Sequence, residues 1–267
     1  MKTTALIAQQ LAPYGVKALP YFDRLKIYVD GKTPLADLKL LLHLNDDNYF
    51  ENSPLSQNEH LVYMLDLYRP EPVEIKSAIK GDCAITYIEI AFDLTTDCKA
   101  TLKAISNFFN RHLVRIPTNR PIHHVNVEGS TNYFSDGSDP ECFVTYDDLP
   151  SRKGPPDRCF HLENRFTKMA AVKKHGLITL DDLVKFDFYR HWDGVLDLRQ
   201  PNFTELGKLA SGKKITRQAW IDFGKKEWGA IQSIQKYLLA HPERVTAFPK
   251  MTMDALQKYL ADALSIC

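Results

Sequence analysis

The chain has 267 residues, of which 44% are hydrophobic and 25% charged, and this composition is sufficient for a sizeable buried core. Its 34 Lys and Arg residues nearly balance its 33 Asp and Glu residues, so the formal net charge is only +1. A globally basic surface is therefore excluded, and any binding of nucleic acid must use a local patch.

Cysteine content and hydropathy narrow the class of protein further. The five cysteines form no C-x-x-C pair, and an odd number does not suit a disulfide framework, so we expect reduced, mostly structural thiols. The apolar patch within residues 1–15 is too short and too interrupted by Gln for a secretory signal, and no later run approaches the ~20 apolar residues of a membrane span. The sequence thus predicts a soluble cytoplasmic protein without a membrane partner.

The first half of the chain predicts strands that alternate with helices. Apolar and polar residues alternate as in strands over residues 21–29, 60–68 and 86–97. Apolar residues at helical spacing, with cap and breaker residues at the ends, predict helices over residues 33–44, 71–80 and 97–113. The predicted order up to this point is β-α-β-α-β-α.

The second half changes character from residue 121 onward. Short alternating runs joined by turn residues predict an antiparallel meander over residues 121–127, 131–135, 141–148 and 158–166. A Thr cap and an acidic first turn predict one helix over residues 177–192, and a linker over residues 201–214 precedes helices at 216–242 and 252–264.

We therefore expect an α+β fold: a mixed or antiparallel sheet built from βαβ-type units, with helices packed on one face and a C-terminal helical appendage. The expected division is a domain over residues 1–200 and a helical region over residues 201–267.

Candidate functional side chains fall on the predicted strands. The period of two places Glu89 and Asp93 together on one face of their strand, and Glu163 and Arg165 together on one face of theirs. Tyr146 lies on the predicted strand over residues 141–148, which comes between those two strands in the chain. A tyrosine, carboxylates that can hold a divalent metal, and an arginine are residue types that cleave a phosphodiester through a tyrosyl ester.

The motifs that carry these residues resemble those of one known family. In chain order they read YIEIAFD, STNYFSDGSD, FVTYDD and FHLENRFTKMAAVKKHGL. This succession resembles the rolling-circle replication initiators, the trans-acting plasmid and filamentous-phage proteins to which some conjugative relaxases are related. The resemblance covers about residues 21–192 and is strongest after residue 130. It implies a DNA nickase and strand transferase that forms a 5′-phosphotyrosyl intermediate at an origin and leaves a free 3′ hydroxyl.

The resemblance also assigns roles to residues of this chain. Tyr146 is the expected nucleophile, and Arg165 is expected to clamp a phosphate oxygen. Asp93 and Glu163, with Glu89 third, are the expected ligands of Mg²⁺ or Mn²⁺. The residues expected to follow the DNA backbone are Arg152, Lys153, Arg158, Lys168, Lys173 and Lys174. The expected partner is origin DNA, single-stranded at the nick, and the C-terminal helices could serve origin recognition, dimerisation to a homodimer, or contact with a helicase.

Two other functions remain open from the sequence. Acidic residues, among them Asp136 and Asp139, occupy the segment YFSDGSDPE where related initiators place basic residues. This feature suits a non-catalytic DNA-binding regulatory protein that kept the same scaffold. A metal-dependent phosphodiesterase, in which water attacks and no covalent adduct forms, is the other alternative.

The site residues also have alternative interpretations. Glu163 and Arg165 could form only an ion pair across a sheet surface. A second metal site could be built from His124, Asn126 and Glu128, which share one face of a predicted strand and are similar to the His cluster of another large class of rolling-circle nucleases.

Overall fold

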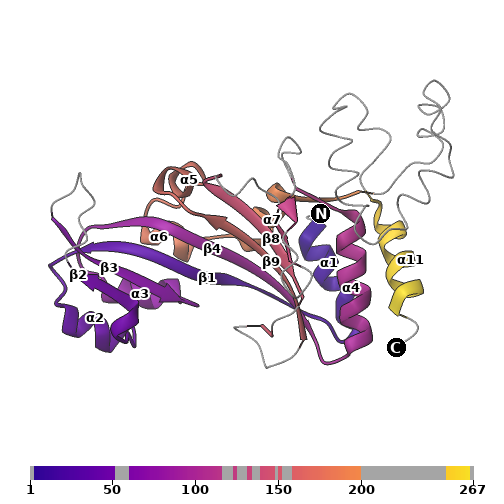
Figure 1. Ribbon diagram of the computed structural model, residues 1–267, viewed down its shortest axis with the longest axis horizontal. Coiled ribbons are helices and arrows are strands. Elements are labelled where there is room, and N and C mark those ends of the chain that lie inside the picture. The colour runs from indigo at the N-terminus through magenta and orange to yellow at the C-terminus, as the bar shows by residue number, and fades with distance from the viewer. Residues whose placement is uncertain are drawn as a thin grey trace, which may run out of the picture.

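An eight-stranded sheet forms the centre of the computed structural model, which describes residues 3–51, 60–115, 123–124, 131–133, 139–147, 150–151, 158–199 and 251–264. The strand order is β2-β3-β1-β4-β9-β8-β7-β6, and each pairing is antiparallel. The strands are β1 (Lys17–Asp30), β2 (Tyr49–Glu51), β3 (Leu61–Tyr68), β4 (Cys83–Thr96), β6 (His123–His124), β7 (Asn132–Tyr133), β8 (Glu141–Tyr146) and β9 (Arg158–Phe166). Figure 1 shows the long strands β1 and β4 running side by side through the molecule.

The sheet contains two split βαβ units. Strands β3 and β4 both pair antiparallel with β1, so they run parallel to each other on either side of it, and α3 (Pro72–Ala78) connects them. In the same way β4 and β8 flank β9, and α4 (Lys99–His112) lies in the connection between them. The predicted α+β class and the antiparallel meander from β6 to β9 are confirmed, with the βαβ-type units present in this split form.

Helices cover one face of the sheet because apolar side chains alternate along the central strands. The Phe109 ring of α4 stacks on Phe160 of β9, with ring centroids 5.2 Å apart. Trp192 of α7 (Phe188–Val195) lies with its ring centroid 6.1 Å from that of Phe92 and 5.9 Å from that of Phe143. The first helix, α1 (Thr3–Leu11), adds Ile7 to the same core. The opposite face of the central strands carries polar side chains.

The predicted single helix over residues 177–192 is wrong, because two helices form there. Thr179 caps α6 (Leu180–Val184) through a reciprocal capping box with Asp182, and that helix ends at Lys185. The Asp187 carboxylate then accepts a hydrogen bond from the backbone N–H of Arg190 and begins α7. A second capping residue within the apolar pattern thus starts a new helix.

The remaining elements are short or peripheral. They are the 3-10 turns at Ala12–Tyr14 and Asp46–Asn48, α2 (Leu35–Leu41), α5 (Met169–Lys174), and the strand pair β5 (Leu113–Arg115) and β10 (Leu196–Leu198). Cysteines 83, 98, 142 and 159 are free thiols. No helix in the described part of the chain has the length and apolar character needed to cross a membrane.

The last helix, α11 (Met253–Leu264), packs on the body of the protein. Its Tyr259 ring lies 4.8 Å from the Phe108 ring of α4, and Figure 1 shows α11 beside α4. The backbone N–H of Met251 donates to the Leu198 carbonyl at 2.7 Å. The predicted linker at 201–214 and the predicted helix at 216–242 lie outside the described residues.

Candidate active site

Strand register gathers the predicted site residues on the polar face of the sheet. In β4 and β9, Glu89 lies opposite Arg165 and Asp93 lies opposite His161. Strand β8 places Tyr146 opposite the same His161. Side chains directly opposite one another on adjacent strands are close enough to interact. The sheet therefore brings the tyrosine, the acids and the arginine of the prediction onto one surface.

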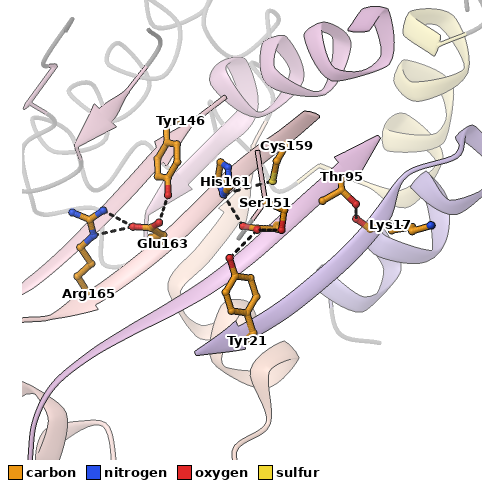
Figure 2. A network of polar contacts seen from close by, with 10 residues as sticks. Lys17, Tyr21, Thr95, Tyr146, Ser151, Cys159, His161, Glu163 and Arg165 are labelled. Atoms are coloured by element: carbon orange, nitrogen blue, oxygen red, sulfur yellow. Dashed lines mark hydrogen bonds and ion pairs between the residues drawn. The ribbon is translucent and has the colours of Figure 1, made fainter. Parts of the chain in front are cut away.

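Tyr146, Glu163 and Arg165 form a chain of hydrogen bonds. The Tyr146 hydroxyl donates to Oε1 of Glu163, and Nε of Arg165 donates to Oε2 of the same carboxylate at 2.9 Å. Figure 2 shows both Tyr146 and Arg165 pointing at the Glu163 carboxylate. Only 7% of Tyr146 and 2% of Glu163 is exposed, whereas the Arg165 side chain is 29% exposed. Solvent thus reaches this group through the arginine.

Arg165 also lies near a second buried acid. Its Nε is 3.6 Å from Oε1 of Glu89, which accepts a hydrogen bond from the Tyr87 hydroxyl. Burial alone would lower the pKa of the Arg165 guanidinium, but the charges of Glu163 and Glu89 raise this pKa above its usual range. Burial and the Glu89 charge raise the pKa of Tyr87, so its hydroxyl keeps its proton.

Asp93 is the centre of a second polar group on the same face. Its Oδ2 accepts from the Tyr21 hydroxyl at 2.9 Å and from Ser151 Oγ at 2.6 Å, while its Oδ1 lies 2.9 Å from Nδ1 of His161. Figure 2 shows Tyr21, Ser151 and His161 converging there. Burial and the Asp93 charge raise the pKa of Tyr21. This buried carboxylate is therefore fully hydrogen-bonded, as its burial requires.

Cys159 joins the Asp93 group through His161. Its Sγ lies 3.6 Å from His161 Nδ1, and donor atoms of Asp93, Cys159 and His161 all lie within 4.8 Å of one another. Burial and the Asp93 charge raise the pKa of the Cys159 thiol. These three residues could hold a metal ion.

The two groups meet at Tyr146. Its ring stacks on the His161 ring with centroids 4.3 Å apart and planes 20° apart, while its hydroxyl reaches Glu163. Among the described residues, Asp93 is the one predicted metal ligand in the cluster that could hold an ion; Glu163 and Glu89 instead face Arg165 and their tyrosines.

Sequence reasoning missed several participants, among them Cys159, His161 and Tyr21. Cys159 and His161 precede Glu163 at steps of two residues, so the alternation used for Glu163 and Arg165 places all four on one face. Tyr21 is a different case, because its contact with Asp93 joins residues 72 positions apart in the chain. No local pattern predicts that pairing.

The predicted DNA-contacting residues are dispersed. Arg158 is exposed at the start of β9 and donates to the Asp97 carbonyl at 3.2 Å. Lys168, Lys173 and Lys174 are exposed at or on α5, a helix whose Ala171 and Val172 pack into the core on the helix-covered face. Arg152, Lys153, Asp136, Asn126 and Glu128 lie outside the described residues, as does the side chain of His124.

Other cations and aromatic rings extend the polar face beyond Arg165. The Arg24 guanidinium lies 5.0 Å from the Tyr68 ring centroid and 5.6 Å from that of Tyr87, and it forms an ion pair with Asp66. Lys26 lies 5.8 Å from the Tyr87 ring. Tyr68 is 48% exposed. Cations beside exposed aromatic rings are typical of surfaces that bind single-stranded nucleic acid.

Comparison with known proteins gave matches in structure but none in sequence. No protein-family model matches the chain, and no curated protein sequence matches it. A solved rolling-circle replication initiator protein from Geobacillus stearothermophilus is similar in structure, with a TM-score of 0.44 and 10% sequence identity over 80% of this chain and 98% of that one. The matching structure is from the family whose motifs this sequence resembles.

Proposed function

We propose that this protein cleaves one strand of DNA and holds the 5′ end on Tyr146, as expected for a replication-initiation or relaxase-like strand transferase. The observation that carries the proposal is the hydrogen bond from the Tyr146 hydroxyl to Oε1 of Glu163, a carboxylate whose Oε2 accepts from Arg165. Phenol is a weak nucleophile until a neighbouring group accepts its proton, and Glu163 is placed to accept it.

The proposed reaction follows from these positions. Glu163 takes the phenol proton, the Tyr146 oxygen forms a bond to phosphorus, and the bond from phosphorus to the 3′ oxygen breaks. The leaving oxygen takes a proton from water and becomes a free 3′ hydroxyl. Arg165, as the partly exposed member, binds a phosphate oxygen and offsets the charge that develops there. The energy of the broken ester is kept in the phosphotyrosyl bond.

The role of Mg²⁺ or Mn²⁺ stays a prediction. Such hard ions prefer oxygen ligands, so they would need Asp93, Glu163 and Glu89 around one point. In the structure Glu163 and Glu89 each contact Arg165, while Asp93 belongs to a cluster with sulfur and nitrogen donors, which does not suit Mg²⁺. No step of the proposed reaction is therefore assigned to an ion.

The proposed substrate is single-stranded DNA that lies along the polar face. Arg24 and Lys26, which both form ion pairs with Asp66, lie next to the Tyr68 and Tyr87 rings, and Arg165, paired with Glu163 and Glu89, lies on the same face beside Tyr146. Such a surface binds backbone phosphates and stacks bases without reading their sequence. The exposed lysines of α5 stay predicted DNA contacts, and they would bind a part of the DNA away from the scissile phosphate.

A denaturing gel tests the nucleophile directly. A pool of 3′-labelled, random-sequence single-stranded oligonucleotides is incubated with the protein and Mg²⁺, Mn²⁺, Zn²⁺ or a chelator. We expect a labelled species of protein size, its absence in Tyr146→Phe, and its presence in the control Tyr63→Phe, which removes a hydroxyl from β3 outside the site. An adduct in Tyr146→Phe would refute the assignment, and cleavage without any adduct would favour the phosphodiesterase alternative.

A second candidate is the non-catalytic DNA-binding protein. The burial of Tyr146, with its hydroxyl already bonded, favours this function because a nucleophile must reach the phosphate. DNA binding with no cleavage under any of the four conditions would establish it in place of the enzyme. The division into residues 1–200 for catalysis and 201–267 for origin recognition, dimerisation or helicase contact stays a prediction.

A further inference from the structure

We propose that Asp93, Cys159 and His161 bind a divalent ion of the zinc class behind Tyr146. This inference does not depend on the proposed function, because it concerns metal binding in the absence of DNA. It shares only Asp93 with the expected Mg²⁺ or Mn²⁺ site, and it differs in the other two ligands and in the ion. Thiolate, imidazole and carboxylate donors together suit Zn²⁺ or Co²⁺, whereas Mg²⁺ requires oxygen donors.

Backbone register fixes the three ligands relative to one another. Asp93 and His161 are directly opposite in the β4–β9 pairing, and Cys159 lies two residues before His161 on the same face of β9. All three side chains are buried, with exposed fractions of 0% for Asp93 and Cys159 and 2% for His161. Ligands presented by paired central strands are more precisely held than ligands on loops.

The donor spacing is close to that of a tetrahedral zinc site. Bonds of about 2.0 Å to nitrogen and oxygen and about 2.3 Å to sulfur separate neighbouring donors by roughly 3.3–3.6 Å. The Cys159 Sγ to His161 Nδ1 distance is 3.6 Å, and the His161 Nδ1 to Asp93 Oδ1 distance is 2.9 Å. An ion would therefore need only a small opening between the histidine and the aspartate. Three protein ligands leave the fourth position for water.

The surroundings of Asp93 provide the outer hydrogen bonds that metal-binding carboxylates have. Tyr21 and Ser151 both donate to Oδ2, which leaves Oδ1 directed at His161 and available to the ion. Such outer partners orient a ligand and typically change metal affinity about 10–100-fold when they are lost.

Binding of the ion would displace one proton from Cys159 and move one proton on His161. The ion replaces the S–H proton of Cys159, which leaves to solvent, and the His161 proton on the Nδ1 side moves to Nε2, so that the imidazole stays neutral. No oxidation or reduction occurs. Because the Tyr146 ring stacks on His161, the bound ion would also fix the plane against which the tyrosine rests.

Metal content and cobalt absorption test the inference on the full-length protein without DNA. We expect about one zinc per chain by mass spectrometry, retained against excess Mg²⁺, and a thiolate-to-cobalt charge-transfer band after replacement by Co²⁺. Cys159→Ser should lower zinc affinity more than about 100-fold, and Tyr21→Phe about tenfold. The matched control Cys142→Ser removes a thiol from the same sheet face outside the cluster and should change neither measurement.

Two results would overturn the zinc site. One is wild-type protein that binds no zinc and gives no thiolate band with Co²⁺. The other is equal loss of metal in Cys142→Ser and Cys159→Ser, which would place the ion elsewhere. If Cys159→Ser does not fold, a protein whose other four cysteines are replaced by serine decides the matter, since it must keep the cobalt band.

Discussion

Replacing His191 with glutamine should remove a large part of the acid sensitivity of the fold. This half-buried imidazole belongs to α7, and the Asn164 amide nitrogen lies 3.2 Å from its Nε2 and 3.5 Å from a Glu141 oxygen. The amide therefore directs its hydrogens at both acceptors, and a protonated Nε2 would face another donor. The nearby charged groups are Glu141 and His175, which lie 3.3 Å apart.

The size of the effect follows from the pKa of His191. Burial first, and the His175 imidazole second, lower this pKa from 6.5 to about 3, against the opposing charge of Glu141. A depressed folded-state pKa means that the contribution to stability is fully present above pH 6.5 and is lost as the pH falls toward 3. The loss is about 1.4 kcal/mol per pH unit, so about 2 kcal/mol disappears between pH 7.5 and pH 5.

Urea unfolding at pH 7.5 and pH 5 measures this loss. The free energy of unfolding of His191→Gln should fall by about 2 kcal/mol less than that of the wild type over this interval, because glutamine does not titrate. His60→Gln, which removes a largely exposed histidine, should leave the wild-type difference unchanged. Equal losses in the wild type and His191→Gln would refute the assignment of a neutral imidazole in the folded protein.

Three further changes test the structure at other points. Arg165→Met should lower the free energy of unfolding by about 2–3 kcal/mol because Glu163 stays buried without its counter-charge, and a second change Glu163→Gln should restore part of the loss in urea titrations. Gly81→Ala should lower the melting temperature because the Cβ of the new alanine would collide with the buried Asp30 carboxylate. An unchanged melting curve would contradict that packing. Thr179→Ala should cost about 1 kcal/mol by removing the cap of α6, measurable as a lower urea midpoint at unchanged slope.

The strands of the sheet were predictable because apolar and polar residues alternate along each of them. Glu89 and Asp93, or Glu163 and Arg165, share a face by alternation alone, and the structure confirms this arrangement. The helix boundaries were harder to predict. Asp187 lies within a continuous apolar pattern, yet a new helix begins there because its side chain accepts a hydrogen bond from the backbone. At such positions a capping residue predicts a helix boundary whereas the apolar period predicts a continuous helix, and the sequence alone does not decide between them.

The partners of the site residues were harder to predict than the residues themselves. Alternation identifies a face but not the strand that pairs beside it, so the Tyr21 contact with Asp93 required the antiparallel pairing of β1 with β4. The prediction rested on charged residues and left out Cys159 and His161, which occupy the same face four and two residues before Glu163. Their proximity to Asp93 depends on a pairing between distant segments.

The position of β4 between β1 and β9 affects how the chain folds during synthesis. Asp93 and His161 are 68 residues apart in the chain, so on the ribosome β4 is made long before the strand that completes it. Until β9 emerges, one side of β4 is an open edge with unpaired amides, which invites pairing with other nascent chains. We expect a fragment that stops before residue 158 to aggregate, whereas one that reaches residue 199 should be recovered in soluble form.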